Sequence, residues 1–588
     1  MARCYPRRTV RLIEIRHLDG PNLYRLEPAL KLEVAIGRRR TWYGKREPEA
    51  HSLVRLGASV PASAQPARIR ALAAWVRQLR RAHPDGAAGS VVVHRSSDPG
   101  HWILEWPWLL GDRAKTIAES ALALAEREVR PGREANRTPR QQRHVANLLD
   151  RVGAAEGAGP TWIRDADRRY PVVSITGTNG KTTTTRLIAH ILRLAGKRVG
   201  TTTSDGIVVD GRMVEPGDWT GPGGAGAILG RDDLDVAVLE TARGGILLRG
   251  VGYESNEASV VTNVSSDHMD VQGIHTLPEL AEVKGVIARM TKPGCWVTLN
   301  ADDRHVAAIA RTVRGRVAFF SLEGDRSPRI RRHVRAGGKA YIVRDGWLGE
   351  AEGDRWRRFA PLADVPVTLG GVARHNVANA LAAAGGARAL GMSVKDVGAG
   401  LRTFVPTAED SRGRLNLFRD DHRVVVVDFA HNEAGVAMLF GVVDAIADAL
   451  GDDGSRAPVS AIVGLAGDRP DDTLRGVGRI VAGRVDRFVL KEMLHYLRGR
   501  TRESVIGEIK AGAREGGWKG ELPLHLTEVE ALSAELDRTD GAGRATPREV
   551  IVLLCHEDRA GVFDLIAKRK LRPVNDLAEL AGLVAHAD

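Results

Sequence analysis

The sequence predicts an α/β protein, with a small α+β domain at its N-terminus and two larger α/β domains behind it. Its 588 residues are too many for a single hydrophobic core, so several domains are expected. Up to about residue 131, alternating segments are mixed with helical ones, which is typical of an α+β domain. From residue 170 onward, short β-branched runs alternate with segments of helical periodicity. This rhythm indicates mostly parallel sheets that are covered on both faces.

The N-terminal domain is expected to cover residues 1–131 and to combine strands with two helices. Period-two alternation predicts the strands, and apolar residues at three-to-four spacing predict the helices. The predicted strands are Val10–Ile15, Leu30–Ile36 and Ser90–His94, and the predicted helices are Pro66–Ala82 and Arg113–Val129.

Residues 132–169 form a polar stretch rich in Arg, Gly and Ala. A short helix over Gln141–Val152 is the one regular element expected there. The stretch contains the run Gly157-Ala158-Gly159-Pro160, and such glycine–proline punctuation is typical of a hinge. We interpret residues 132–169 as a linker.

Two α/β domains follow, over residues 170–405 and 406–588. Short runs rich in β-branched residues, separated by helical segments, predict a buried parallel sheet in each of them. In the first, the predicted strands are Val172–Thr176, Val236–Glu240, Ser259–Val264 and Trp296–Leu299; in the second they are Val424–Phe429, Ser460–Leu465, Arg487–Leu490 and Val550–Leu554.

The composition is that of an ordinary soluble globular protein, with 43% hydrophobic and 27% charged residues. Three cysteines lie far apart without C-x-x-C spacing, which argues against disulfides or a thiolate zinc site. We find no signal-peptide pattern and no apolar run of the roughly 20 residues that a membrane span needs. We therefore expect a cytoplasmic protein without a membrane partner.

The chain is basic, because 86 Lys and Arg residues outnumber 73 Asp and Glu residues and leave a net charge of +13. Such an excess can attract nucleic acids, nucleotides or acidic polymers. The arginines are scattered among acids, without a basic tail or a basic-aromatic motif. We therefore do not expect nucleic acid to be the main partner.

A glycine-rich turn between a predicted strand and a predicted helix indicates a nucleoside triphosphate site. The sequence V-V-S-I-T-G-T-N-G-K-T-T-T spans residues 172–184. Gly177 and Gly180 allow a close approach of the backbone, and amide N–H groups at the helix start face the phosphates. Lys181 supplies a cation for the outer phosphates, and Thr182 offers a hydroxyl to Mg²⁺. Ile175 stands where the strict pattern has glycine, so this phosphate loop is a variant form.

A second glycine-rich segment, Gly221–Gly226, matches G-x-G-x-x-G, the pattern of dinucleotide-binding turns. It lacks a hydrophobic strand directly before it and contains Pro222 inside the turn. A dinucleotide site needs the strand–turn–helix context. We interpret this segment as a loop that contacts substrate or is simply flexible.

Polar side chains follow two further predicted strands. Glu240 ends Val236–Glu240, where a carboxylate near a phosphate loop is expected to bind Mg²⁺ directly or through water. The next strand is followed by a polar cluster that contains His268 between acids, so we favour a site role for this histidine. Lys284 lies in a helical segment, Leu277–Met290, and by local pattern alone is a solvated charge.

These segments together resemble the Mur ligase superfamily, the ATP-dependent amino-acid ligases of peptidoglycan precursor and folylpolyglutamate synthesis. They occur in the family's order over about 400 residues. The motifs are G-T-N-G-K-T-T (177–183), Glu240, T-N-V-S-S-D-H-M-D (262–270), Lys284, N-A-D-D (300–303), R-H-N-V-A-N-A-L-A-A (374–383), G-R-L-N (413–416), D-F-A-H-N (428–432) and G-D-R (467–469).

Within the superfamily, four segments resemble the Mur-like half of the cyanophycin synthetases, and the N-terminal I-R-H-L-D-G-P-N (15–22) fits the same comparison. They are T-T-T-S-D-G-I-V-V-D-G-R (201–212), G-D-W-T-G-P (217–222), L-E-T-A-R-G-G-I-L (239–247) and G-D-R-P-D-D (467–472). In those enzymes an ATP-grasp domain extends an aspartate backbone, and the Mur-like half joins arginine to the aspartate side chain. Here a stretch of about 40 residues stands in the place of the ATP-grasp domain, so autonomous polymer synthesis is not expected.

The resemblance implies a role for each matching residue. Lys284 matches a position that many Mur ligases carbamylate, which would make it a bridge to the metal. The implied catalytic residues are Lys181, Glu240, His268, Lys284, Asp428 and His431, and the implied Mg²⁺ ligands are Thr182, Glu240 and His268. The implied ATP contacts are Gly177, Thr178, Asn179, Gly180, Lys181, Thr182, Thr183, Asn376, Asn379 and Arg414. The implied substrate contacts are Thr203, Ser204, Asp205, Thr220 and Glu492.

The function implied is ATP-dependent ligation of a carboxylate and an amine through an acyl phosphate. Amino acids or peptides would be the substrates, with arginine joined to an aspartate-type acceptor, a separate ATP-grasp ligase as a working partner, and a homo-oligomer as the assembly. Two alternatives stay open: the same chemistry on an unrelated cell-wall or secondary-metabolite acid, and a catalytically weak nucleotide-dependent binding module.

Overall fold

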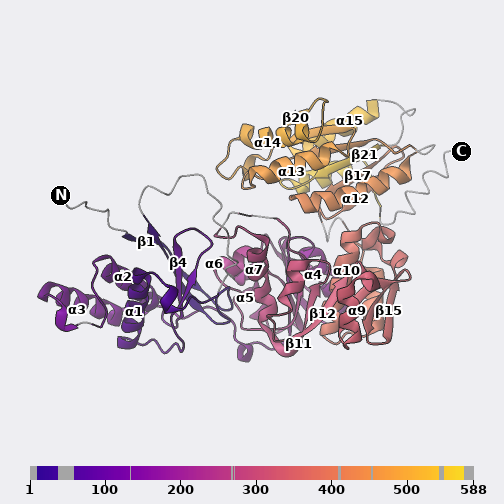
Figure 1. The fold of residues 1–588 in the computed structure, drawn as a ribbon. Coiled ribbons are helices and arrows are strands. Elements are labelled where there is room, and N and C mark those ends of the chain that lie inside the picture. Colours follow the sequence, from indigo (N-terminus) through magenta and orange to yellow (C-terminus); the bar gives the residue numbers. More distant parts are fainter. Residues whose placement is uncertain are drawn as a thin grey trace.

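The computed structural model describes residues 9–37, 58–132, 134–266, 269, 272–407, 412–451, 455–541 and 549–574. Three groups of elements follow one another along the chain (Figure 1). Each group has its own sheet, of four, eleven and seven strands. Short 3-10 turns join several elements: η1 Ala62–Ala64, η2 Glu134–Asn136, η3 Asp165–Asp167, η4 Gly324–Arg326, η5 Leu362–Asp364, η6 Pro366–Gly371 and η7 Leu494–Tyr496.

The N-terminal sheet is antiparallel, in the order β1-β2-β4-β3. Its elements are β1 Thr9–Leu18, β2 Ala29–Gly37, β3 Val92–Arg95, β4 His101–Pro107, α1 Ala67–Ala82, α2 Gly111–Glu126 and α3 Pro139–Ala154. Helix α3 is longer than the short helix predicted in the polar stretch, and Thr138 and Gln141 form a capping box at its start. Val145, Leu148 and Val152 of α3 join the same hydrophobic core as α1 and α2. Part of the stretch interpreted as a linker therefore packs as a layer of the N-terminal unit.

The central sheet has eleven strands in the order β15-β14-β13-β12-β11-β10-β5-β9-β6-β7-β8. Its middle is parallel, and each end is an antiparallel extension. The strands are β5 Val172–Thr176, β6 Val199–Thr202, β7 Gly206–Val209, β8 Arg212–Pro216, β9 Val236–Glu240, β10 Asn256–Val261, β11 Thr291–Asn300, β12 Arg316–Ser321, β13 Lys339–Arg344, β14 Trp347–Glu352 and β15 Arg355–Pro361.

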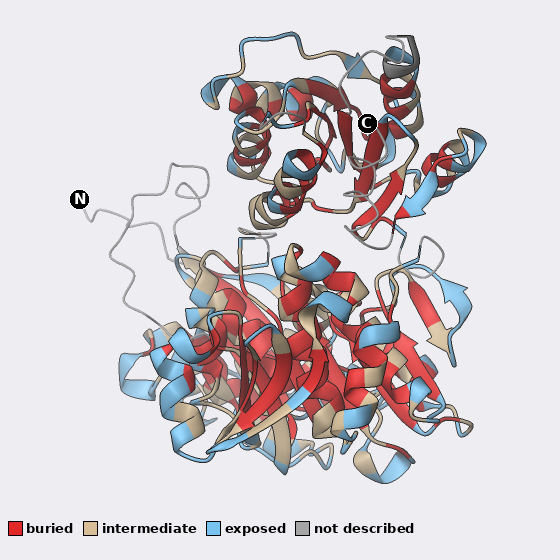
Figure 2. Cartoon of the chain, turned by 90° about the vertical axis from the view of Figure 1, so that its right-hand side faces the viewer, coloured by how far each residue is buried: buried red, intermediate tan, exposed pale blue. Residues whose placement is uncertain are grey.

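Helices cover both faces of the central sheet, as parallel strands require. Helices α4, α10 and α11 share one core with it, and α5 to α9 share the other. Figure 2 shows the buried strands between these layers. The helices are α4 Lys181–Leu194, α5 Pro222–Leu229, α6 Arg243–Leu248, α7 Leu277–Arg289, α8 Arg304–Ile309, α9 Pro328–Arg335, α10 Arg374–Ala389 and α11 Val394–Thr403.

The C-terminal sheet has the order β20-β19-β18-β21-β17-β16-β22, in which β16 is antiparallel to both of its neighbours, β17 and β22, and the other pairs are parallel. Helices α12, α13 and α14 pack on one face, and α15 and α16 on the other. The elements are β16 Asn416–Arg419, β17 Arg423–Asp428, β18 Val459–Val463, β19 Arg487–Lys491, β20 Leu524–His525, β21 Glu549–Leu554, β22 Arg572–Val574, α12 Glu433–Leu450, α13 Asp471–Ala482, α14 Arg502–Glu515, α15 Glu528–Gly541 and α16 Arg559–Lys568.

The predicted fold class is confirmed, since an antiparallel N-terminal sheet precedes two sheets with parallel middles. The glycine-rich segment Gly221–Gly226 was expected to be a loop, and this was wrong. It begins helix α5, with Gly221 as its N-cap and Pro222 at the first helical position. Burial of Gly224, Ala225 and Ile228 explains the difference, because packing overrides the low helix propensity of glycine.

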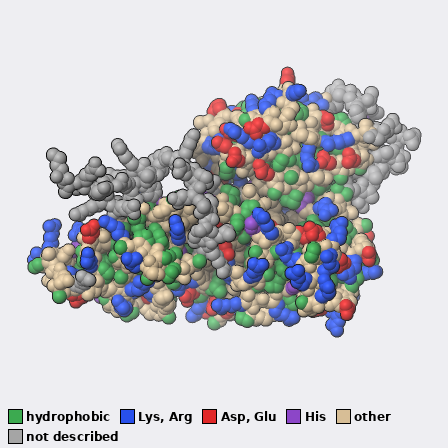
Figure 3. Space-filling model, viewed as in Figure 1, with side chains coloured by type: hydrophobic (Ala, Val, Ile, Leu, Met, Phe, Trp, Pro, Cys, Tyr) green, Lys and Arg blue, Asp and Glu red, His purple; other side chains and the backbone are tan. Residues whose placement is uncertain are grey.

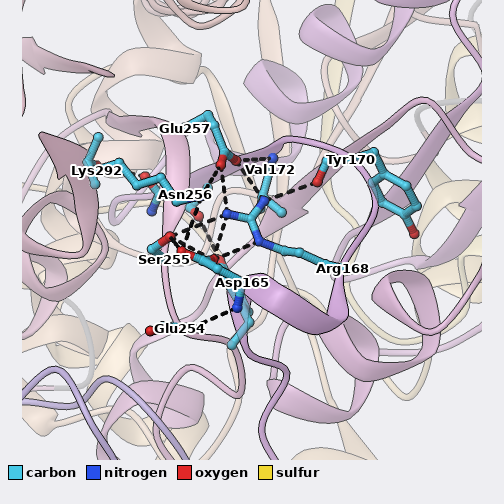
Figure 4. Close-up of polar contacts among 12 residues, drawn as sticks. Asp165, Arg168, Tyr170, Val172, Glu254, Ser255, Asn256, Glu257 and Lys292 are labelled. Carbon is cyan, nitrogen blue, oxygen red and sulfur yellow. Dashed lines mark hydrogen bonds and ion pairs between the residues drawn. The ribbon is translucent and has the colours of Figure 1, made fainter. Parts of the chain in front are cut away.

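A polar network fixes the amino end of β5, at the edge opposite the phosphate loop (Figure 4). The Arg168 guanidinium donates to both carboxylate oxygens of Glu257 at 2.7 Å. Arg168 also donates to Asp165, and Lys292 pairs with both acids. Glu257 also accepts from the Val172 amide at 2.8 Å. Burial raises the pKa of Glu257, but its hydrogen bonds and Arg168 hold that pKa below its usual range. This ion-pair network therefore fixes the position of Val172, the first residue of β5.

In the part of the chain that the structure describes, no helix has both the length and the apolar character needed to cross a bilayer.

Candidate functional site

The phosphate loop lies at the carboxyl edge of the central sheet, between β5 and α4, as predicted. Two of its glycines have no room for a side chain. A Cβ on Gly177 would lie 1.8 Å from Thr262 Oγ1, and one on Gly180 would lie 2.1 Å from Asn379 Oδ1. Gly180 also has φ of +82°, a left-handed conformation that glycine adopts without strain. The loop thus needs glycine at both positions.

The end of β10 supports this loop through hydrogen bonds to its backbone. The Thr178 amide donates to Asn263 O at 2.9 Å, and the Asn179 amide donates to Asn263 Oδ1 at 2.9 Å. Thr262 Oγ1 and Asn263 Nδ2 both donate to Asn179 O, at 2.7 and 3.0 Å. Asn263 stood in a quoted motif, but sequence reasoning gave it no role. Its carbonyl and side chain hold the backbone of the phosphate loop.

The side chains of Thr182 and Glu240 are in contact at the start of α4. Thr182 Oγ1 donates to Glu240 Oε2 at 2.9 Å and lies 3.3 Å from Ser204 Oγ. Glu240 is only 3% exposed. Burial raises the pKa of its carboxyl group, against the lowering effect of Lys181 and Arg414. Within the described residues no ion pair with Glu240 is formed, so this buried carboxylate fits a divalent cation as its partner.

Lys181 is the first residue of α4, and its Nζ donates to Thr178 O at 3.0 Å. Thr183 lies in the same first turn, whose amide N–H groups have no partner inside the helix. Amides, lysine and hydroxyl together suit the phosphates of a nucleotide with Mg²⁺. The oxygen donors Thr182 and Glu240 are the residues that would hold the metal.

Lys284 is buried in α7 with 4% exposure, so the solvated charge that its local pattern suggested is wrong. Its Nζ donates to Gly177 O at 2.7 Å, which places it under the phosphate loop. Few lysines are buried without a functional or paired role. His268 lies outside the described residues, so the structure does not test its place.

Asn376 and Asn379 link the loop to a pocket. Asn379 Nδ2 donates to Asn376 Oδ1 at 3.0 Å, and Asn379 Oδ1 lies against Gly180. Asn376 lines a pocket of about 260 Å³ between α10 and the C-terminal sheet. Its remaining lining is mostly apolar: Pro366, Val367, Leu369, Pro406, Thr407, Leu415, Asn416, Leu417, Phe418, Pro573 and Val574. A mostly apolar pocket with two side-chain amides, Asn376 and Asn416, next to a phosphate loop, fits a nucleobase.

The C-terminal sheet presents its carboxyl edge to the phosphate loop. Asn179 and Asn432 exchange side-chain hydrogen bonds of 3.3 and 3.2 Å. Arg414 Nη2 donates to Ser204 Oγ at 3.1 Å, while Arg414 Nε is buried and has no hydrogen-bond partner among the described residues. The two larger units therefore meet over the predicted nucleotide site.

Asp428 and His431 lie on this same edge. Asp428 accepts from the amides of Leu415 and Ala430 at 2.7 and 2.8 Å, and burial raises its pKa. The His431 ring contacts Phe429, with ring centroids 5.2 Å apart. Phe429 also lies under the guanidinium of Arg414 at 4.6 Å. Asp428 thus braces two segments, the one before β16 that carries Arg414 and the one after β17 that carries His431.

Asp205 lies among three guanidiniums. It accepts from Arg186 at 2.9 Å and from Arg559 at 2.7 Å, and Arg414 acts on it through its charge. Burial raises the Asp205 pKa, but the arginines outweigh this and hold it below its usual range. Arg559 begins α16 of the C-terminal unit, so this ion pair crosses between the units.

Two other predicted substrate contacts, Thr203 and Thr220, form hydrogen bonds within the chain. Thr203 Oγ1 accepts from the Asp205 and Gly206 amides, so it shapes the turn. Thr220 Oγ1 donates to Asp218 at 2.6 Å, and its carbonyl accepts from Ala242, two residues beyond Glu240. Thr203 therefore precedes Ser204, which contacts Thr182 of the phosphate loop, and Thr220 lies beside the segment that follows Glu240.

Glu492 follows β19, which is separated from β17 by two strands, β18 and β21, in the C-terminal sheet. It is 7% exposed and forms an ion pair with Arg502. The structure brings it to the same carboxyl edge but not into contact with the phosphate loop.

Three residues at the junction were missed: Asn432, Arg559 and Arg186. Asn432 closes the D-F-A-H-N motif, and Arg559 follows the polar end of β21. A signal existed, since polar residues after parallel strands gather at one edge. Arg186 lies on α4 amid apolar residues, and no local pattern marks it.

Comparison with known proteins gives one family and several relatives. The family described as "Mur ligase middle domain" matches residues 175–387. A cyanophycin synthetase of Crocosphaera subtropica is 39% identical over 439 residues, which are 74% of this chain and 48% of that protein. The chain thus spans about half the length of the curated relatives of this kind.

A second relative, the UDP-N-acetylmuramoyl-L-alanyl-D-glutamate–2,6-diaminopimelate ligase of Alkalilimnicola ehrlichii, is 28% identical over 66% of this chain and 72% of that protein. Among solved structures, a Mycobacterium tuberculosis folylpolyglutamate synthase with ADP and AMPPCP has a TM-score of 0.49, with 19% identity over 68% of this chain and 91% of that one.

Proposed function

The chain belongs to the Mur ligase superfamily of ATP-dependent ligases, and from that premise we propose that it joins an amino acid to a carboxylate acceptor through an acyl phosphate. The observation that carries this proposal is the buried Thr182–Glu240 contact at the start of α4, beside Lys181. It supplies the donors that a nucleoside triphosphate and Mg²⁺ need, next to residues of a second unit.

The proposed reaction has two steps. The acceptor carboxylate oxygen attacks the γ-phosphorus of ATP, and ADP leaves with the electron pair of the broken bond. A deprotonated amine then attacks the acyl carbon of the acyl phosphate, and inorganic phosphate leaves. The products are an amide, ADP, inorganic phosphate and the proton that the amine nitrogen loses.

This chain's own residues would serve both steps by orientation and by charge, which dominate phosphoryl transfer. Lys181 is suited to the outer phosphates, and Arg414 to the oxygens that gain charge. Mg²⁺, bound at Thr182 and Glu240, would neutralise charge on the phosphate oxygens. The contacts between Asn179 and Asn432 and between Asp205 and Arg559 support a site that closes and excludes water.

Some parts of the proposal rest on resemblance alone. We propose arginine as the amine and an aspartate side chain as the acceptor, since the cyanophycin synthetases resemble this chain over 74% of its length. Carbamylation of Lys284, a role for His268 and for His431, a homo-oligomer and a separate ATP-grasp ligase as partner belong to the same proposal, as does the division of the chain at residues 131, 169 and 405.

The test measures phosphate release from ATP with a panel of amines and a panel of acceptors, followed by mass spectrometry of the product. Arginine with an aspartate peptide is expected to stimulate release and to yield a product heavier by one arginine residue. Stimulation only by another amine or acid would refute the substrate assignment. No stimulation by any pair would refute ligase activity and favour the binding module.

Glu492 gives a sharper test of the amine. A carboxylate pairs with a guanidinium more strongly than an amide does. Glu492→Gln is therefore expected to raise KM for arginine about tenfold while KM for ATP stays unchanged. A change in KM for ATP instead would show that Glu492 acts on the fold and not on the amine.

A further inference from the structure

One stretch of the central unit carries most of the excess positive charge of the chain. Residues 304–358 contain thirteen arginines and one lysine against six acidic residues, so they contribute +8 of the net +13. The expectation of scattered arginines is therefore wrong for this stretch. Figure 3 shows Lys and Arg side chains over α9 and β15. No part of the proposed ligase reaction uses this region.

Seven exposed arginines there form what we call the basic face: Arg326, Arg329, Arg331, Arg332, Arg335, Arg355 and Arg358. Among the described residues, none of the seven pairs with a carboxylate, whereas nearby Arg344 pairs with Asp325. Arg329 donates to the Ala301 carbonyl, and Arg331 donates to the Asp325 and Arg326 carbonyls. Backbone carbonyls orient these side chains without neutralising them.

Helix α9 keeps these charges at a cost in stability. Its eight residues are P-R-I-R-R-H-V-R, without an acid. Arg331 and Arg335 are four positions apart, and Arg332 and Arg335 are three apart, and each such like-charge pair destabilises the helix. The helix dipole favours cations in the last turn but disfavours Arg329 in the first. Ile330 is fully buried, so packing holds the helix despite the repulsion.

The basic face continues from α9 onto the edge of the sheet. The Gly353 amide donates to Val334 O at 3.2 Å, which brings the β14–β15 turn against the last turn of α9. Arg355 begins β15, the last strand of the central sheet. Arginines from two elements therefore lie on one exposed surface.

The indole rings beside this face are already covered by arginines of the chain itself. Arg344 lies 4.6 Å from the Trp356 ring, and Arg358 lies 5.3 Å from the Trp347 ring. Stacking on a guanidinium fixes the arginine and leaves its N–H groups facing outward. Single-stranded nucleic acids need open aromatic faces for their bases, and these two rings do not offer them.

We propose that the basic face binds an acidic polypeptide through its carboxylates. Guanidiniums without acidic partners match isolated carboxylates by paired hydrogen bonds, and charge complementarity steers such a partner to the surface. An aspartate-rich chain is also the kind of acceptor proposed above, so the face would hold the acceptor while one of its side-chain carboxylates is joined to the amine. The binding rests on the proposed function only for that last step, because the face itself takes no part in ATP turnover.

The test is binding of fluorescent poly-L-aspartate to the full chain, measured by anisotropy at two salt concentrations. The face variant carries Arg332→Glu, Arg335→Glu and Arg355→Glu. The matched control carries Arg140→Glu, Arg143→Glu and Arg212→Glu, three exposed arginines of α3 and β8. Both change the net charge equally. Thermal unfolding confirms that each is folded, and phosphate release is recorded in parallel.

We expect the face variant to bind poly-L-aspartate at least about tenfold more weakly, the control to stay within about twofold, and salt to weaken wild-type binding. The proposal is overturned if wild type does not bind, or if both variants lose equally, since net charge alone would then explain it. It is also overturned if duplex DNA or single-stranded RNA binds wild type more tightly than poly-L-aspartate and the face variant loses that binding. Phosphate release without poly-L-aspartate binding, or the reverse, tells failure of one proposal from failure of the other.

Discussion

The ion pair between Asp205 and Arg559 offers a direct test of whether the two larger units meet in this way during turnover. Its N–O distance is 2.7 Å, with side-chain exposures of 12% and 26%. We expect Arg559→Ala and Asp205→Asn each to lower kcat/KM for the amine, and the double variant to be little worse than either single one. The reason is that either substitution already breaks the same contact between the units.

The size of the effect follows from the burial of the pair. Exposed ion pairs contribute about 0.2–1 kcal/mol, and breaking a buried pair costs about 3–5 kcal/mol. This pair lies between the two, and Asp205 keeps Arg186 as a second partner. We therefore expect a coupling energy of about 1–2 kcal/mol, or about five- to thirtyfold in kcat/KM.

The assay is a double-mutant cycle on amine-stimulated phosphate release at saturating ATP. A matched cycle with Arg186→Ala serves as control, because Arg186 pairs with Asp205 within the central unit and does not span the units. That cycle should show coupling in thermal stability even without substrates. Single effects of Asp205→Asn and Arg559→Ala that simply add would refute the reasoning, since the pair would then not exist in the reacting conformation.

Three further predictions concern the loop and its surroundings. Glu240→Gln should lower ATP-dependent phosphate release at least about a hundredfold and weaken the Mg²⁺ dependence, with unchanged circular dichroism; retained activity would contradict a metal role. Gly180→Ala should be more damaging to ATP binding and to thermal stability than Gly196→Ala, because both glycines have φ near +80° but only Gly180 has a close neighbour, Asn379; equal losses would show backbone strain alone. Desolvation lowers the pKa of His375, which is half-buried, to about 4 from 6.5, so the unfolded chain binds the proton first as pH falls. Stability should therefore drop by up to about 3 kcal/mol between pH 6.5 and 4, and His375→Gln should flatten this slope in urea unfolding.

The centre of the fold was accessible from sequence because its signals are local. The run Val172–Thr176, its glycine-rich turn and the helix after it lie within a few residues of one another, and each agrees with the same structure. Glu240 was found in the same way, as the last residue of a short β-branched strand. A polar residue at the end of a strand can be recognised from a few residues of sequence, and it marks the sheet edge at which ligands bind.

Other parts were not accessible, for two physical reasons. The strands β13 to β15 are rich in charge and separated by short turns, so their alternation is obscured. Helix α5 forms because packing outweighs its glycines. Contacts between the units join residues far apart in sequence, 253 positions for Asn179 and Asn432 and 354 for Asp205 and Arg559, and no spacing rule reaches them.

The exchange of hydrogen bonds between Asn179 and Asn432 has a consequence for the order of events. Both groups are uncharged amides, so separating them exposes no ion to water and costs on the order of 1 kcal/mol. This pair of hydrogen bonds can break and re-form in every catalytic cycle, and its strength does not depend on salt or pH. Asn179 also belongs to the phosphate loop. A ligand that stabilises the conformation in which Asn179 and Asn432 are hydrogen-bonded must therefore bind that conformation more tightly than the separated one. Nucleotide affinity and the contact between the two larger units would then be coupled. Release of ADP would favour separation of the units, and separation of the units would favour release of ADP.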